Sequence, residues 1–289
     1  MKESLQGKGI LAANLRLLAD ERDARAAKGE LMAAEAARML AEPYVKDADR
    51  ISRFEGATAE FLPLAGGLAP RERVAFVREM LVCCREAGMP MLPKELLPIR
   101  EDIPERVSYF RTVYTDEAYD GFAAAMREPT VQYADAFFLS CEDVKGGEAG
   151  YCILPCENSD GPLPAMTAIA DRYGLFRVGT YRAFHADGEN ATHFGLFSPA
   201  LSSLPRAEAL LLRFSCVLAD EAALSLHLSA LAALGLRVLR SEGESPAEGG
   251  ALSCTFLCGV GQGELTAALL YLRIFAERLV LRGLYEEIG

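Results

Sequence analysis

Hydrophobic residues in the first ninety positions recur with the spacing of α-helices. Between residues 11 and 42, leucines and methionines form a stripe that ends just before Pro43, and this pattern predicts one long helix. A second helix is expected over residues 70 to 87, because apolar positions again repeat at helical spacing and Gly88 follows as a stop signal. We therefore predict a helical module over residues 1–89.

A proline-rich segment follows this helical module. Four prolines fall within fifteen residues, namely Pro90, Pro93, Pro98 and Pro104. Proline fixes its own backbone angle and lacks an amide hydrogen, so such a stretch is stiff and cannot continue a helix. We predict a linker over residues 90–105.

Beyond the linker, short apolar runs alternate with helical patterns. Strands are predicted over residues 107–110, 149–155, 175–184 and 192–197, and helices over residues 114–126 and 163–173. This alternation indicates an α/β module over residues 106–200.

The segment 207–289 repeats the alternation in a definite order. Strands are predicted over residues 209–218, 236–241, 251–260 and 278–285, and helices over residues 221–234 and 263–276. The order is βαββαβ, which is typical of ferredoxin-like domains. The whole sequence therefore predicts an α+β protein of several domains.

Composition and charge narrow the range of partners. The chain of 289 residues is 51% hydrophobic and 25% charged, as folded globular proteins are. Its formal net charge of -11 opposes binding to nucleic acids and to anionic membranes. The N-terminal residues lack the apolar core of a secretion signal, and we expect a cytoplasmic protein. The eight cysteines lack the Cys-x-x-Cys spacing of zinc or redox sites, so we expect buried thiols, no metal and no cofactor.

Two motifs of the α/β module resemble those of prephenate dehydratases. Residues 150–159 have the sequence Gly-Tyr-Cys-Ile-Leu-Pro-Cys-Glu-Asn-Ser, similar to the family strand that ends in Pro-x-Glu-Asn-Ser, and Leu-Phe-Arg-Val-Gly follows at residues 175–179. Residues 190–194, Asn-Ala-Thr-His-Phe, resemble the Asn-x-Thr-Arg-Phe motif that carries the family's catalytic threonine. The resemblance implies substrate binding by Glu157, Asn158 and Ser159, and catalysis by Thr192, His193 and Phe194.

The flanking modules extend the resemblance. Residues 76–85 are similar to the final helix of a chorismate mutase domain. The C-terminal module resembles the ACT domain, which binds phenylalanine as a feedback inhibitor, and Leu224 and Glu242 match positions of its ligand motifs. The order of modules resembles that of the bifunctional chorismate mutase/prephenate dehydratase enzymes of phenylalanine biosynthesis. Because an ACT sheet typically pairs with another across subunits, the resemblance also implies a homodimer.

The chain departs from this family at several places. Prephenate dehydratases resemble type II periplasmic binding proteins with two lobes, but only residues 186–189 stand where the family inserts most of its second lobe. His193 replaces a motif arginine, and residues 109–115 contain no glycine where the family has a Gly-rich turn. The last mutase-like helix ends in Glu86, Ala87 and Gly88, without the family's glutamine. We therefore expect a one-lobe, degenerate module and no chorismate mutase activity.

Histidines offer a further reading of the sequence. A hydrolase triad is suggested by four residues that lie close together in the sequence, namely His185, Asp187, His193 and Ser198. Closeness in sequence, however, is not the geometry that a triad requires. His227, on a predicted helix, is expected to be a packed residue rather than a ligand. We expect neither a triad nor a metal site from these residues.

Three hypotheses of function follow from different classes of protein. In the first, a degenerate homologue binds phenylalanine or another amino acid, or regulates a catalytically competent prephenate dehydratase. In the second, an active dehydratase converts prephenate into phenylpyruvate, water and CO2 in a cleft that the helical module or another subunit completes. In the third, the protein only assembles with a partner. The short 185–190 connection favours the first over the second, and retention of Thr192 with Glu157–Ser159 argues against the third.

Overall fold

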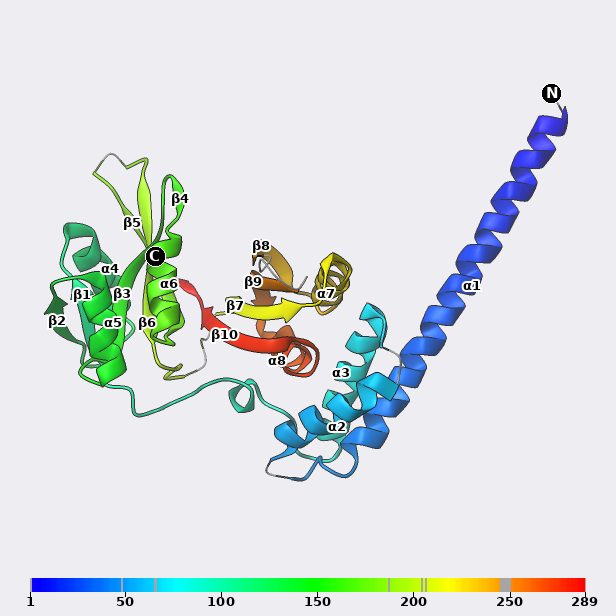
Figure 1. The fold of residues 1–289 in the computed structure, drawn as a ribbon, viewed down its shortest axis with the longest axis horizontal. Helices are drawn as coiled ribbons and strands as arrows, with labels where there is room; N and C mark the ends of the chain where they lie inside the picture. Colours follow the sequence, from blue (N-terminus) through cyan, green and yellow to red (C-terminus); the bar gives the residue numbers. More distant parts are fainter. Residues whose placement is uncertain are drawn as a thin grey trace. The chain divides into compact units, whose positions relative to one another are not determined.

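The computed structural model describes residues 2–47, 49–64, 67–186, 188–203, 205, 207–244 and 251–288 (Figure 1). The chain divides into two compact units. A helical unit comprises Met1–Leu92, Ala222–Leu234 and Thr266–Phe275, and a sheet unit comprises Pro93–Glu221, Gly235–Leu265 and Ala276–Gly289. Among the described residues, no helix is both long and apolar enough to cross a membrane.

The helical unit begins with three consecutive helices, α1 (Lys2–Ala41), α2 (Arg50–Leu64) and α3 (Pro70–Glu86). The helix α3 starts where the sequence predicts it, and the Glu72 carboxylate accepts a hydrogen bond from the amide of Ala69 at 2.7 Å, which closes its first turn. It packs on α1 through one apolar face. The sequence pattern does not predict α2, because Gly56 and Pro63 interrupt its apolar spacing.

Two later helices belong largely to the same unit, α7 (Glu221–Ala233) and α8 (Gln262–Phe275). Phe275 of α8 meets Phe76 of α3 edge to face, with ring centroids 6.1 Å apart. The guanidinium of Arg73, also on α3, lies 5.3 Å from the centre of the Phe275 ring. Aromatic contacts between early and late helices therefore hold this unit together.

Over the part of the chain that the structure describes, the sheet unit is built on one mixed sheet of eleven strands. The nine strands of its main path follow the order β2-β1-β3-β6-β5-β10-β7-β9-β8. They are β1 (Arg106–Phe110), β2 (Thr130–Ala134), β3 (Tyr151–Asn158), β5 (Phe176–Phe184), β6 (Ala191–Ser198), β7 (Ala209–Leu218), β8 (Arg237–Glu244), β9 (Leu252–Gly261) and β10 (Glu277–Tyr285). The short β4 (Gly161–Pro162) pairs with β3, and the short β11 (Glu287–Ile288) pairs with β5.

Strand directions change along the sheet. The strand β1 is parallel to β2 and β3, whereas β6 lies antiparallel between β3 and β5. The run β10-β7-β9-β8 is wholly antiparallel. Gly283 of β10 also pairs in parallel with Arg177 of β5. The segments 106–200 and 207–289 therefore share one sheet, and their division into domains stays a prediction.

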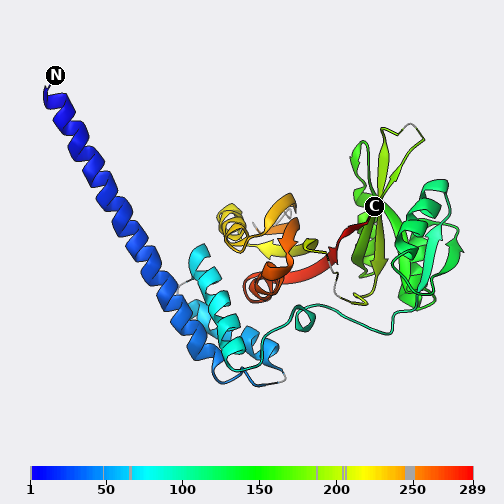
Figure 2. The ribbon, with the colours of Figure 1, turned by 180° about the vertical axis from the view of Figure 1, so that it is seen from behind.

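Three helices cover the two faces of the first part of the sheet (Figure 2). On one face, α4 (Val113–Ala123) contributes to a core cluster of Val107, Tyr109, Ala118, Phe122, Tyr151, Ile153, Ala183, Phe194 and Leu196. On the other, α5 (Phe137–Gly146) and α6 (Pro164–Arg172) contribute to a cluster of Cys141, Val144, Ala149, Cys152, Leu154, Cys156, Ala170, Leu175 and Phe197. The sequence pattern does not predict β2 or α5. The strand β2 lies at the sheet edge with its side chains exposed or half-buried, so it carries little apolar signal.

Candidate functional site

Four strands of the sheet carry register shifts against a neighbouring strand. The shifts fall between Pro155 and Glu157 on β3, between Arg177 and Gly179 on β5, and between Val238 and Arg240 on β8, and β10 carries two, between Glu277 and Val280 and between Leu281 and Gly283. Register shifts of this kind re-aim side chains and are frequent beside functional sites. The shifts on β3, β5 and β8 stand at the charged residues Glu157, Arg177 and Arg240.

These charged residues line a cavity of about 170 Å³ in the sheet unit. Three guanidinium groups, three carboxylates and an imidazole meet there beside hydroxyl groups and apolar walls. The polar lining consists of Glu157, Thr167, Arg177, Thr180, His193, Arg213, Arg240, Glu242, Thr255, Tyr285 and Glu287. The apolar lining consists of Cys156, Pro162, Pro164, Leu211, Phe256 and Leu257. Burial raises the pKa of the Cys156 thiol, so it contributes as a neutral group.

Two of the three guanidinium groups have carboxylate partners. Arg240 Nη2 lies 3.3 Å from Glu157 Oε2. Arg213 Nη1 lies 3.7 Å from Asp171 Oδ1, an oxygen that Arg282 also approaches, at 3.3 Å. Because these side chains are partly exposed, each pair contributes little stability, about 1 kcal/mol or less. The main effect of these ion pairs is to hold the charged groups of Arg213 and Arg240 in defined positions around the cavity.

The third guanidinium, that of Arg177, is held by neutral groups. Its Nη2 donates to Thr180 Oγ1 at 2.6 Å, and Thr180 Oγ1 in turn donates to the carbonyl oxygen of Phe194 at 3.1 Å. The guanidinium also lies 4.6 Å from the centre of the Tyr285 ring. Burial works against the charged form, but interaction with the ionisable acidic groups around it, the carboxylates of Glu157 and Glu287 among them, outweighs this cost and raises the pKa of Arg177. A positive charge is therefore fixed in this wall of the cavity.

The two predicted residues Thr192 and His193 lie on opposite faces of β6, since consecutive residues of a strand alternate. His193 lines the cavity, pairs across the strands with Glu157 and has its Nδ1 4.0 Å from Glu287 Oε1. Thr192 is buried on the other side, where its Oγ1 lies 2.9 Å from His185 Nε2. His185 in turn stacks on Tyr114, with ring centroids 4.5 Å apart. The structure thus brings Glu157 and His193 together and separates Thr192 from them.

The remaining predicted residues are dispersed. Phe194 is buried in the core cluster on the α4 face. The Asn158 side chain accepts a hydrogen bond from the amide of Asp160 at 3.0 Å, and Ser159 is exposed in the same turn. Glu242 of β8 lines the cavity, whereas Leu224 of α7 belongs to the helical unit.

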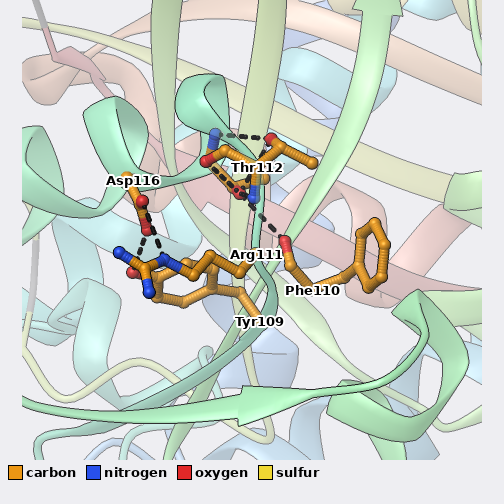
Figure 3. A network of polar contacts seen from close by, with 6 residues as sticks. Tyr109, Phe110, Arg111, Thr112 and Asp116 are labelled. Atoms are coloured by element: carbon orange, nitrogen blue, oxygen red, sulfur yellow. Dashed lines mark hydrogen bonds and ion pairs between the residues drawn. The ribbon is translucent and has the colours of Figure 1, made fainter.

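The end of β1 is occupied by a network of its own side chains (Figure 3). Asp116 accepts hydrogen bonds from the Tyr109 hydroxyl at 2.9 Å and from Arg111 Nε at 3.1 Å. Thr112 Oγ1 accepts from the amide of Thr115 at 3.1 Å and caps α4. Burial and the neighbouring Asp116 raise the pKa of Tyr109, so its hydroxyl stays protonated. These side chains fill the end of β1 and the start of α4.

Solved structures similar to this chain include a prephenate dehydratase from Streptococcus mutans. It matches with a TM-score of 0.50 at 14% sequence identity, covering 64% of this chain and 99% of its own. The fold is prephenate dehydratase-like. A prephenate dehydratase from Arthrobacter aurescens in complex with L-Phe (TM-score 0.48, 16% identity, 62% of this chain and 89% of its own) and GqqA, a novel type of quorum quenching acylase (TM-score 0.49, 25% identity, 63% and 94%), are also similar. No protein-family model and no curated protein matches the sequence.

Within this dehydratase-like fold, the described members of the suggested triad, His185, His193 and Ser198, do not come together. His185 contacts Thr192 rather than Ser198, and His193 points into the cavity on the other face. Asp187 lies outside the described residues. His227 is buried, and Tyr271 Oη lies 3.4 Å from its Nδ1, as a packed residue should be. Over the described part of the chain, no three His, Cys, Asp or Glu side chains are placed to hold a metal ion.

The sequence pattern missed the arginines that line the cavity. Arg177 stands inside the Leu-Phe-Arg-Val-Gly motif, Arg213 inside a ten-residue apolar strand, and Arg240 inside β8. A charged residue within an apolar strand is costly to bury unless it is paired, so each could have been noticed as a candidate. Their convergence could not have been noticed, because it depends on the pairing of β5 with β10.

Proposed function

We propose that this protein is a degenerate, prephenate dehydratase-like protein that binds a free amino acid in the cavity of the sheet unit. One observation carries the proposal. Thr192, which matches the family's catalytic threonine, and Glu157, which matches its substrate-binding motif, stand on opposite faces of the sheet. Dehydration of prephenate needs a proton donor beside the groups that bind the substrate, so the separation of these two side chains supports a loss of that activity.

The chemistry of the cavity supports an amino-acid ligand. An amino acid carries a carboxylate and an ammonium group a few ångströms apart, and the cavity presents guanidinium and carboxylate groups side by side. The apolar walls at Leu211, Phe256 and Leu257 suit a hydrophobic side chain. The order β10-β7-β9-β8, with α7 and α8 between strands in the chain, agrees with the βαββαβ order on which the ACT resemblance rests. L-phenylalanine is therefore the first ligand to test.

The resemblance also favours assembly through the ACT-like strands. A homodimer formed there would follow the habit of ACT domains, and a catalytically competent homologue would be the natural target of regulation. The alternative function is an active prephenate dehydratase whose cleft another subunit or the helical module completes. The hydrogen bond between Thr192 and His185 favours that alternative, because it keeps a polarised hydroxyl at the motif position.

Two measurements on one sample test the proposed function. The purified chain is incubated with prephenate while phenylpyruvate is followed, and phenylalanine is titrated into it by calorimetry. We expect no turnover above a protein-free blank and saturable binding of phenylalanine, weakened about tenfold by Glu157→Gln. Turnover that Thr192→Ala abolishes would instead establish an enzyme, and the proposed function would be wrong.

A further inference from the structure

We propose that Arg177 binds the carboxylate of the ligand and sets the specificity of the cavity for free acids over their amides. This inference rests on the proposed function and adds the group that recognises the ligand. Arg177 lies on β5 at the register shift beside Gly179. It belongs to neither of the sets of residues that the sequence resemblance assigns to substrate or effector.

The argument begins with charge. Arg213 and Arg240 already have carboxylates within ion-pair distance. Among the residues that the structure describes, Arg177 has no such carboxylate, and its contacts are a hydroxyl, a carbonyl and an aromatic ring. A guanidinium carries five N–H donors and cannot lose its charge in a protein. A partly buried guanidinium that meets only neutral protein groups therefore has donors to offer to an anion in the cavity.

The guanidinium is also held in place before any ligand arrives. Thr180 Oγ1 accepts from Nη2 on one side, and the Tyr285 ring lies against the planar group. Such support lowers the entropy that is lost when a ligand binds, because the long side chain is already ordered. Planar donors that are fixed in this way suit a carboxylate, which can accept two parallel hydrogen bonds.

Two glycines make room for this side chain. A Cβ at Gly195 would lie 3.0 Å from Arg177 Nε, besides 2.8 Å from Cys156 Sγ. A Cβ at Gly283 would lie 2.9 Å from both the Cβ and the carbonyl oxygen of Arg177. The strands β6 and β10 flank β5, and each has a glycine without a side chain next to Arg177. A larger residue at Gly195 would push the guanidinium from its place, and one at Gly283 would press on the Cβ and backbone of Arg177.

The opposite charge of the ligand has a counterpart in the same cavity. Glu287 acts on Arg177 electrostatically and lies on the cavity wall. Glu157 lies on the same wall but is paired with Arg240. Glu242 adds a further carboxylate from β8. An ammonium group beside Glu242 and Glu287 would be stabilised while the ligand carboxylate lies on Arg177. The arrangement therefore fits a zwitterion better than a simple anion, because a simple anion has no group to pair with these two carboxylates.

A comparison of two ligands on the unchanged protein tests the inference. L-phenylalaninamide carries a neutral carboxamide in place of the carboxylate of L-phenylalanine, and calorimetry at a pH where both ammonium groups are protonated gives the Kd of each. We expect the amide to bind at least about tenfold more weakly, because it offers no charge to Arg177. If phenylalanine does not bind, the other protein amino acids are screened by thermal shift, and the tightest is compared with its own amide.

Variants then assign the effect to Arg177. Arg177→Gln should bind the acid and the amide equally weakly, and Arg177→Lys should keep part of the preference for the acid. Arg182→Gln is the matched control, because Arg182 lies on the same strand and is exposed. Circular dichroism shows whether each variant is folded. If Arg177→Gln does not fold, the comparison of the acid with its amide on the unchanged protein still tests the inference.

The outcomes separate the two proposals. If no amino acid binds the unchanged protein, the proposed function is wrong and the inference falls with it. If an amino acid binds and its amide binds as tightly, the proposed function stands and the role of Arg177 is wrong. Equal loss of affinity in Arg177→Gln and Arg182→Gln would also overturn the inference, since only general charge would then matter.

Discussion

At the scale of single residues, the buried His227 makes stability depend on pH. Burial, with the positive Arg73 nearby, lowers its pKa to about 4 from the ordinary 6.5. The unfolded chain therefore takes up this proton first as the pH falls. The contribution of neutral His227 to stability is complete above about pH 6.5 and is lost progressively toward pH 4.

Replacement of His227 by glutamine should flatten this dependence. Between about pH 8 and about pH 5, we expect the free energy of unfolding of the unchanged protein to fall by roughly 2 kcal/mol more than that of His227→Gln. Urea denaturation followed by circular dichroism at both pH values measures the difference. Other titrating groups are common to both proteins and cancel. Equal losses in the two proteins would show that His227 is not held neutral by the fold.

At the scale of single residues, the sequence can identify candidate site residues but not the face of the sheet on which each one lies. The motifs drew attention to Glu157 and His193, which line one cavity, and their role there stays a prediction. They also placed Thr192 with His193, because adjacent residues belong to one motif. In an extended strand, adjacency puts side chains on opposite faces, so the same motif divides between the cavity and the α4 face. Only the strand pairing reveals which member faces the cavity.

At the scale of elements, the start of α4 depends on its cap (Figure 3). Thr112 Oγ1 accepts from the amide of Thr115, and the Thr115 hydroxyl accepts from the amide of Thr112 at 2.7 Å. We expect Thr112→Ala to lower the free energy of unfolding by about 1 kcal/mol, because an amide at the helix start loses its partner. Thr112→Ser keeps the hydroxyl and should lose less than half as much. Denaturation of the three proteins measures this, and equal losses would point to the missing methyl group instead.

Elements with strong alternation were predictable, and those set by tertiary pairing were not. The strand β7 begins and ends where the sequence pattern places it, because its buried and half-buried positions alternate along ten residues. The helix α2 and the edge strand β2 have weaker patterns and were missed. The register shifts at β3, β5 and β8 leave no mark in hydrophobic periodicity, since they depend on which strand lies opposite.

At the scale of the whole molecule, the cavity lies entirely in the sheet unit. A ligand that binds only the folded protein at about 100 times its Kd should add roughly 2.7 kcal/mol of stability. Amide hydrogen exchange should therefore slow most in β3, β5, β7, β8 and β9, whose residues make up most of the cavity lining. The helices α1 to α3 should change little, and they serve as an internal reference within the same sample. Equal protection throughout the chain would place the ligand elsewhere.

The strands β10 and β11 have a consequence for any attempt to study the chain in pieces. Both pair with β5, through Gly283 and through Glu287 and Ile288, although they come from the far end of the sequence. A fragment cut near residue 200 would keep β5 but leave that side of it open. Open strand edges recruit other chains, so such a fragment invites aggregation in place of a soluble half-molecule.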